Sequence, residues 1–260
     1  MRVFNDQRTR NGDGFDLDCC TRVMASNCDI DSGDDCIAIR ANRMQLKDQS
    51  RESRGIVISN CILKTCCNAF RIGVGDGIIR DVTVSNIVIR ETRTGICIVS
   101  KYAEHYPGVA IDNVLFDNIV MDCVRPFNLA SNIRGTTDES TQAPIGRITF
   151  SNIRGRATRS SLLTGNPDCR LGDIDFRNID LIYSGGGDIV RDGHYAEFGP
   201  HRAAPAGFYL ENVHHVTLED IRLAWLDADS RFEYGVIGKN TCDIRIRNSE
   251  FHKPNQGAFA

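Results

Sequence analysis

The sequence predicts an all-β fold, a right-handed parallel β-helix of about eight coils, and three observations lead to this prediction. First, one phrase recurs along the 260 residues: apolar, any residue, apolar, any residue, Asn, apolar. Second, each copy alternates with period two and is rich in Val, Ile, Thr and Phe, which is typical of a short strand with one buried face. Third, helical periodicity is absent. These features indicate strands that repeat along the chain and stack on one another.

The copies of the phrase give the order of the expected strands. They read MASNCDI, IVISNCIL, VTVSNIVI, VLFDNIVM, ITFSNIRG, IDFRNIDL, VTLEDIRL and IRIRNSEF. Their polar anchors are Asn27, Asn60, Asn86, Asn118, Asn152, Asn178, Asp220 and Asn248, spaced by 26 to 42 residues. A unit of this size with two or three strands cannot bury its own apolar face, but stacked units bury a continuous core. We therefore expect residues 1–260 to form a single β-helix domain with loops of variable length.

The Asn that recurs at the anchor position has a structural role. Asn tolerates the left-handed backbone conformation of a tight turn, and its amide can bond to the Asn of the coil above. A β-propeller is the structural alternative. Its blades use four strands and hairpin turns, and Asn-Gly or Asp-Gly pairs do not occur here at the rate that such hairpins need.

Composition excludes several function classes. A net charge of -3 argues against nucleic-acid binding, which needs a basic face. The longest apolar runs are a few residues, short of the roughly 20 that cross a bilayer, and the charged residues 1–20 show no export signal. The 11 cysteines form no CxxC or Cys/His set, so we expect mostly small buried thiols, no metal and no cofactor. Neither nucleic acid nor membrane is an expected partner.

Acid is concentrated near the N-terminus, in NGDGFDLD (residues 11–18) and GDDC (residues 33–36). Residues one coil apart in a β-helix lie about 4.8 Å from each other. Asp13 and Asp34 are 21 positions apart, so they should lie on neighbouring coils. Asp35 and Asn68 each lie eight residues after an anchor and should stand side by side. Arg71, with Arg40, should line the same groove.

Crowded carboxylates cannot all ionise easily, so at least one pKa in this groove should rise. Such an arrangement keeps one carboxylic acid protonated while its neighbour acts as a base, as glycoside hydrolysis requires. The alternative for Asp13, Asp34 and Asp35 is that Asp-Gly and Gly-Asp only make turns. A calcium loop at Asp29 and Asp31 fails the EF-hand pattern, because the place of its bidentate Glu is taken by Arg.

At these residues the sequence resembles glycoside hydrolase family 28, the polygalacturonase and rhamnogalacturonan hydrolase family, whose fold is a pectin-lyase-like right-handed β-helix. The family motif Asn-Thr-Asp-Gly, apolar, Asp is similar to NGDGFD, and Gly-Asp-Asp-Cys matches residues 33–36 in full. The resemblance implies that Asp34 is the general acid and that Asp13 and Asp35 hold the water that attacks with inversion. It implies a pectin-type poly- or oligosaccharide substrate from plant cell walls, and relatives that are often secreted or periplasmic.

The chain departs from the family pattern at two motifs and at its start. Asn68 replaces the His of the Gly-His-Gly motif, and Cys97, Ile98 and Val99 replace Arg-Ile-Lys, whose cations hold a galacturonate carboxylate. The family also carries several coils ahead of its first motif, which this chain reaches at residue 11. Either N-terminal coils are lacking, or a partner or another copy, in a homo-oligomer, covers the first coil.

The remaining candidates bind substrate. Arg40 and Arg71 could grip a uronic acid bidentately in place of the lost cations, or could simply pair with cleft aspartates. His194 and His201 lie in a long Gly- and Pro-bearing segment of the kind that builds binding walls on solenoids. The predicted function is therefore an inverting glycoside hydrolase. A calcium-dependent polysaccharide lyase on the same fold and a non-catalytic carbohydrate-binding β-helix are the rivals.

Overall fold

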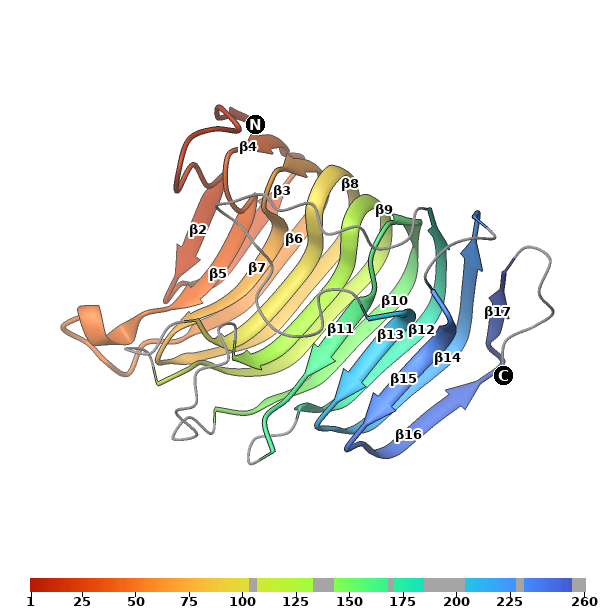
Figure 1. Cartoon of the computed structure of the whole chain (residues 1–260). Coiled ribbons are helices and arrows are strands. Elements are labelled where there is room, and N and C mark those ends of the chain that lie inside the picture. Colours follow the sequence, from red (N-terminus) through yellow and green to blue (C-terminus); the bar gives the residue numbers. More distant parts are fainter. Residues whose placement is uncertain (103–106, 133–142, 168–170, 185–203, 228–231, 254–260) are drawn as a thin grey trace.

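The computed structural model describes residues 1–102, 107–132, 143–167, 171–184, 204–227 and 232–253. Its strands wind into coils that stack along one axis from the N-terminal to the C-terminal end (Figure 1). The strand pairings found among these residues are parallel. The predicted parallel β-helix is confirmed. Within the described residues no helix is long and apolar enough to span a bilayer.

One side of the stack, which we call the front sheet, holds the first strand of each coil. It consists of β2 (Phe15–Asp18), β5 (Ile37–Ala41), β7 (Asn68–Gly75), the ends of β8 (Ile78–Lys101) and β9 (Ala110–Asn132), β11 (Ser161–Thr164), β13 (Ala206–Glu211) and β15 (Tyr234–Lys239). The other sides hold β1 (Arg2–Phe4), β3 (Thr21–Ser26), β4 (Asp29–Ser32), β6 (Ser53–Thr65), the starts of β8 and β9, β10 (Ile145–Ala157), β12 (Leu171–Tyr183), β14 (Val213–Trp225), β16 (Cys242–Arg247) and β17 (Glu250–His252). A short 3-10 helix, Arg43–Gln45, follows β5.

The repeat anchors turn the chain at one corner of every coil. All eight have a left-handed backbone, with φ between 49° and 58°. Several of their amides are joined between coils: Asn86 Nδ2 donates to Asn60 Oδ1 at 3.1 Å, Asn118 Nδ2 donates to Asn86 Oδ1 at 2.7 Å, and Asn178 Nδ2 donates to Asn152 Oδ1 at 2.7 Å. Both uses predicted for the anchor, the left-handed turn and the inter-coil bond, are confirmed.

A second left-handed corner lies five residues before each anchor. It is formed by Arg22, Gly55, Asp81, Asn113, Arg147, Asp173, His215 and Asp243, with φ between 49° and 64°. Because these residues share no side-chain type, the sequence gives no sign of this corner. The chain therefore bends at both ends of a short straight strand. The residues of this strand are those of the recurring phrase.

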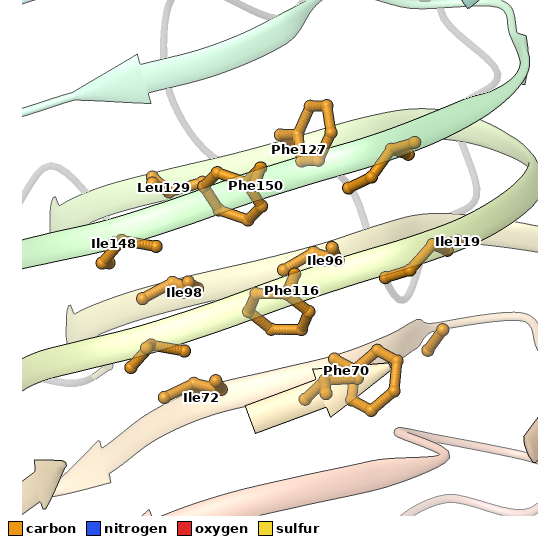
Figure 2. Close-up of a cluster of buried hydrophobic side chains, with 14 of the residues drawn as sticks. Phe70, Ile72, Ile96, Ile98, Phe116, Ile119, Phe127, Leu129, Ile148 and Phe150 are labelled. Carbon is orange, nitrogen blue, oxygen red and sulfur yellow. The ribbon is translucent and has the colours of Figure 1, made fainter. Parts of the chain in front are cut away.

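The core is a continuous column of apolar side chains inside the coils (Figure 2). Phe116 and Phe150 stack at 5.4 Å between ring centroids, and Phe150 and Phe176 stack at 4.7 Å. Each of these rings lies two residues before an anchor, so the repeat places them in register. Of the ten cysteines in the described part of the chain, seven are buried and all are free thiols, which confirms their predicted packing role.

Candidate functional site

The two acidic motifs lie on neighbouring coils at one end of the front sheet. NGDGFD leads into β2 and GDDC leads into β5, which pair in parallel. Gly14 N donates to Asp35 O at 2.8 Å, and Asp34 N donates to Gly12 O at 3.3 Å. Asp13 is thus held directly against Asp34 and Asp35, as the spacing predicts.

The glycines of both motifs allow this close approach of two backbones. A Cβ atom at Gly14 would lie 2.2 Å from the carbonyl oxygen of Cys36, and one at Gly33 would lie 2.4 Å from that of Asp6. Both distances are shorter than any non-bonded contact, and the obstacles are backbone atoms that cannot move aside. Glycine is required wherever backbones approach so closely.

The backbone at Asp34 is fixed by neighbouring hydroxyl groups. Ser32 Oγ donates to the carbonyl oxygen of Asp34 at 2.9 Å, and the Thr65 hydroxyl donates to the same oxygen from the next coil. These bonds use only main-chain atoms of Asp34. Its half-buried carboxyl group is therefore positioned from a fixed backbone.

Asp35 lies deeper than the other two aspartates and has a specific partner. Asn68 Nδ2 donates to Asp35 Oδ1 at 2.6 Å, and both residues are 7% exposed. Asn68 therefore stands beside Asp35, as counting from the anchors predicts. Burial raises the pKa of Asp35, and the nearby positive charge of Arg71 opposes that rise.

Arg71 is a buried cation with unused hydrogen-bonding capacity. Its side chain is packed so that the residue is only 2% exposed, and its guanidinium lies 5.2 Å from the centre of the Tyr102 ring. Nη1 donates to Cys97 Sγ at 3.5 Å, whereas Nη2 is buried and has no hydrogen-bond partner among the described residues. A buried guanidinium nitrogen without a partner is costly, so this position favours an anionic ligand.

Arg40 lies at the opposite edge of the acidic cluster. Its Nη1 is 2.9 Å from a carboxylate oxygen of Asp16, and its Nη2 is 3.6 Å from one of Asp13. Arg40 is thus paired with aspartates of the first coil. Of the two uses predicted for it, binding a uronic acid or pairing with aspartates, the structure has the second. Asp16 is itself exposed while it holds this arginine.

The carboxyl group of Asp13 has a strongly perturbed pKa. Burial, followed by the negative charges of Asp16 and Asp35, raises the pKa of Asp13 from 3.8 to about 7. The predicted upward shift within the acidic cluster is therefore present, and a proton remains on this side chain close to neutral pH.

Replacing Asp13 with Asn should stabilise the protein at pH 8 and change little at pH 4. Because the pKa of Asp13 is higher in the folded state, the wild type loses stability as pH rises from about 4 to about 7, by up to about 4 kcal/mol. The Asn variant lacks this loss. Urea unfolding at both pH values measures the difference, with exposed Asp122→Asn as control. Equal effects at pH 4 and pH 8 would contradict the assigned shift.

Asp34, Asp35 and Cys67 form the group of described residues whose ligand atoms lie close enough to hold a metal ion, within 4.8 Å of one another. Two features oppose a metal there. Burial strongly raises the pKa of the Cys67 thiol, and metals bind the thiolate. Arg93 Nη2 also donates to Cys67 Sγ at 3.2 Å, which places a cation at the sulfur already.

Several cations on this face were not predicted from the sequence. Arg93 lies beside Cys67, while Lys101 and Arg125 are 2% and 1% exposed. Arg125 pairs in register with Thr94, which in turn pairs with Asn68. Counting from the anchors could have found Arg125, since Asn68 and Thr94 each lie eight residues after theirs. Arg125 lies only seven residues after its anchor, because the β8–β9 register shifts between Ile89 and Thr92.

The predicted substrate-binding residues His194 and His201 lie outside the described residues. The predicted residues that the structure brings together are therefore Asp13, Asp34, Asp35, Asn68 and Arg71, with Arg40 at the edge of the acidic cluster. These residues come from adjacent coils of one sheet.

Comparison with known proteins shows the family to which the chain belongs. The family model described as glycosyl hydrolases family 28 matches residues 1–198. The chain is 25% identical over 171 residues to a polygalacturonase of Penicillium digitatum (62% of this chain, 43% of that protein). It is 25% identical over 197 residues to endopolygalacturonase I of Aspergillus niger (70% of this chain, 48% of that protein). The chain thus spans less than half the length of these relatives.

A solved structure supports the same fold assignment. The family 28 exopolygalacturonase of Yersinia enterocolitica superposes with a TM-score of 0.55 at 17% identity, covering 95% of this chain and 39% of that one. At this identity the likeness concerns the fold, and the match to the family model is the stronger finding. By that match over most of its length, this chain belongs to glycosyl hydrolase family 28.

Proposed function

We propose that the protein hydrolyses glycosidic bonds in pectin-type polysaccharides or oligosaccharides, galacturonan or rhamnogalacturonan, with inversion and without a cofactor. The observation that carries this proposal is the cluster of three carboxyl groups from two adjacent coils, of which Asp13 has a pKa of about 7. Inverting hydrolysis needs one carboxyl group that gives a proton to the leaving oxygen and another that takes a proton from the attacking water, and a pKa near 7 suits the second role. The family membership and the polygalacturonase relatives support the same substrate class.

In the proposed reaction Asp34 donates a proton to the glycosidic oxygen as the bond from that oxygen to the anomeric carbon breaks. Asp13 and Asp35 hold a water molecule on the opposite face of the sugar and accept its proton as its oxygen attacks. A base works best when its pKa lies near the working pH, and the raised pKa values of Asp13 and Asp35 suit that role. Asn68 keeps Asp35 in place through its 2.6 Å hydrogen bond.

For substrate binding we propose Arg71 as the principal cation, with Asn68, Arg40, His194 and His201 as further contacts; the two histidines lie outside the described residues. Arg71 Nη2 is buried without a partner among the described residues, and a uronate carboxylate would supply one. Arg40 already pairs with Asp16, so its part is to shape the acidic edge.

Replacing Arg71 with Met should raise KM for a uronate-containing substrate about tenfold or more, since a charge-assisted hydrogen bond contributes about 1.5 to 3 kcal/mol. Initial rates over a range of substrate concentrations measure the change. Exposed Arg90→Gln serves as control and should leave KM unchanged. An unchanged KM for Arg71→Met, with intact folding, would remove Arg71 from the binding site.

The proposed function is tested by reducing-end release from homogalacturonan, rhamnogalacturonan and a neutral glucan. Release from a uronate polymer alone supports the proposal. Formation of an unsaturated, ultraviolet-absorbing product that is lost on adding a chelator would instead establish a lyase. Binding of the polymer without any release would establish a non-catalytic carbohydrate-binding protein.

A further inference from the structure

Two buried cysteines occupy equivalent positions on neighbouring coils. Cys28 and Cys61 each follow a repeat anchor directly, at the corner between β3 and β4 and within β6. The residues around them are paired in register, Ser26 with Ser59 and Asp29 with Ile62. Cys28 therefore lies opposite Cys61 in a parallel pair, about 4.8 Å away, the normal spacing between neighbouring strands.

The two thiol groups also have the same local geometry. Cys28 Sγ donates to the carbonyl oxygen of Ser26 at 3.4 Å, and Cys61 Sγ donates to that of Ser59 at 3.2 Å. Each thiol thus bonds two residues back along its own coil, so the side chains point the same way and stack. Their exposed fractions are 7% and 1%. A Cα separation between about 4.4 and 6.8 Å suits a disulfide, and the strand spacing lies within that range.

This cysteine pair is confined to the first two repeats of the chain. The residue that follows the anchor in the next five repeats is Ile87, Ile119, Ile153, Ile179 and Ile221. Among these seven repeats, the residue after the anchor is thus Cys rather than Ile only in the two coils that carry the acidic motifs. Cys28 belongs to the coil of Asp13, and Cys61 belongs to the coil of Asp34 and Asp35.

We propose that Cys28 and Cys61 form an inter-coil disulfide when the protein meets a thiol oxidant, and that this bond joins the two coils that carry the aspartate cluster. With oxidised glutathione, the thiolate of one cysteine attacks the disulfide and releases one glutathione thiol. The second cysteine thiolate then attacks the mixed disulfide and releases the other. The protein loses two protons and two electrons, and the oxidant gains both as two thiols. The inference rests on the coil geometry and is independent of the proposed function.

The bond should stabilise the N-terminal end of the stack. It closes a loop of residues 28–61 and so restricts the unfolded chain. By the loop-length relation the melting temperature of the oxidised protein should rise by about 5 °C or more. Burial raises the pKa of the Cys61 thiol, so the exchange should proceed faster as pH increases toward the value at which the thiolate forms.

The test compares the full chain after incubation with reduced and with oxidised glutathione, followed by alkylation of the remaining thiols and proteolysis. Trypsin releases residues 23–40 and 55–64, and further cleavage before Asp29 separates Cys28 from Cys36. Mass spectrometry should then find residues 23–28 joined to residues 55–64 in the oxidised sample only. The melting temperature is measured on the same two samples.

Two variants make the result specific. Cys28→Ser should abolish both the linked peptide and the shift in melting temperature, whereas Cys36→Ser, in the same tryptic peptide, should retain both. Absence of the linked fragment after oxidation, or linkage of Cys28 to a different cysteine, overturns the proposal. A linked fragment with no rise in melting temperature overturns the stabilising role. Because the wild-type comparison needs no substitution, misfolding of a variant does not decide the outcome.

Discussion

Replacing Asp34 with Asn is expected to lower kcat on the cleaved polysaccharide about a hundredfold or more, because Asn cannot donate the proton that the leaving oxygen needs. The fold should be unaffected. The main-chain carbonyl of Asp34 accepts from Ser32 and Thr65, and its main-chain N–H donates to Gly12, so an isosteric amide leaves these bonds in place. Initial rates of reducing-end release measure the loss, and the unfolding curve verifies the fold.

The control for this substitution is Asp122→Asn, which removes an exposed carboxylate elsewhere on the coils. Its rate should equal that of the wild type. If Asp34→Asn retained more than about a tenth of the wild-type kcat, the proton would have to come from another group. Asp13, with its pKa of about 7, would then be the first candidate.

Replacing Phe150 with Ala is expected to lower the free energy of unfolding by about 3 to 5 kcal/mol. Phe150 is fully buried, and its ring lies beside that of Phe116 (Figure 2), at 5.4 Å between centroids. On its other side it stacks on Phe176 at 4.7 Å. The cavity would open in the middle of the stack, where coils on both sides are fixed and cannot collapse into it. Urea unfolding monitored by circular dichroism measures the change.

The matched control is Leu115→Ala, on β9 beside the column but pointing outward and 37% exposed. Its cost should be below about 1 kcal/mol, since little apolar area is lost from the core. A cost for Phe150→Ala as small as that of Leu115→Ala would show that the aromatic column contributes little to the stability of the stack.

The fold can be predicted from the sequence because one residue position, the anchor, marks the same turn in every coil. The anchor Asn is recognisable because its left-handed turn and inter-coil amide bond restrict the residue type. From this position, counting places Asp35 beside Asn68 and Arg71 beside Cys97, and the structure has both pairs. Because stacked coils keep the same register, counting residues from the anchor is sufficient to place these pairs.

The sequence fails where the register or the side-chain type varies. The second left-handed corner accepts Arg, Gly, Asp, Asn and His, so no residue type marks it. Because the register shifts between β8 and β9, counting eight residues from the anchor does not find Arg125. The ion pair between Arg40 and Asp16 depends on side-chain conformation rather than on coil position, which is why the sequence left two uses of Arg40 open.

The measurement that tests the central claim most directly is the configuration of the new reducing end, followed by proton NMR during the first minutes of reaction on a uronate oligosaccharide. Inverting hydrolysis by the aspartate cluster predicts that the first product has the anomeric configuration opposite to that of the cleaved bond. A first product with retained configuration would contradict the roles given to Asp13, Asp34 and Asp35, and an unsaturated product would contradict hydrolysis itself.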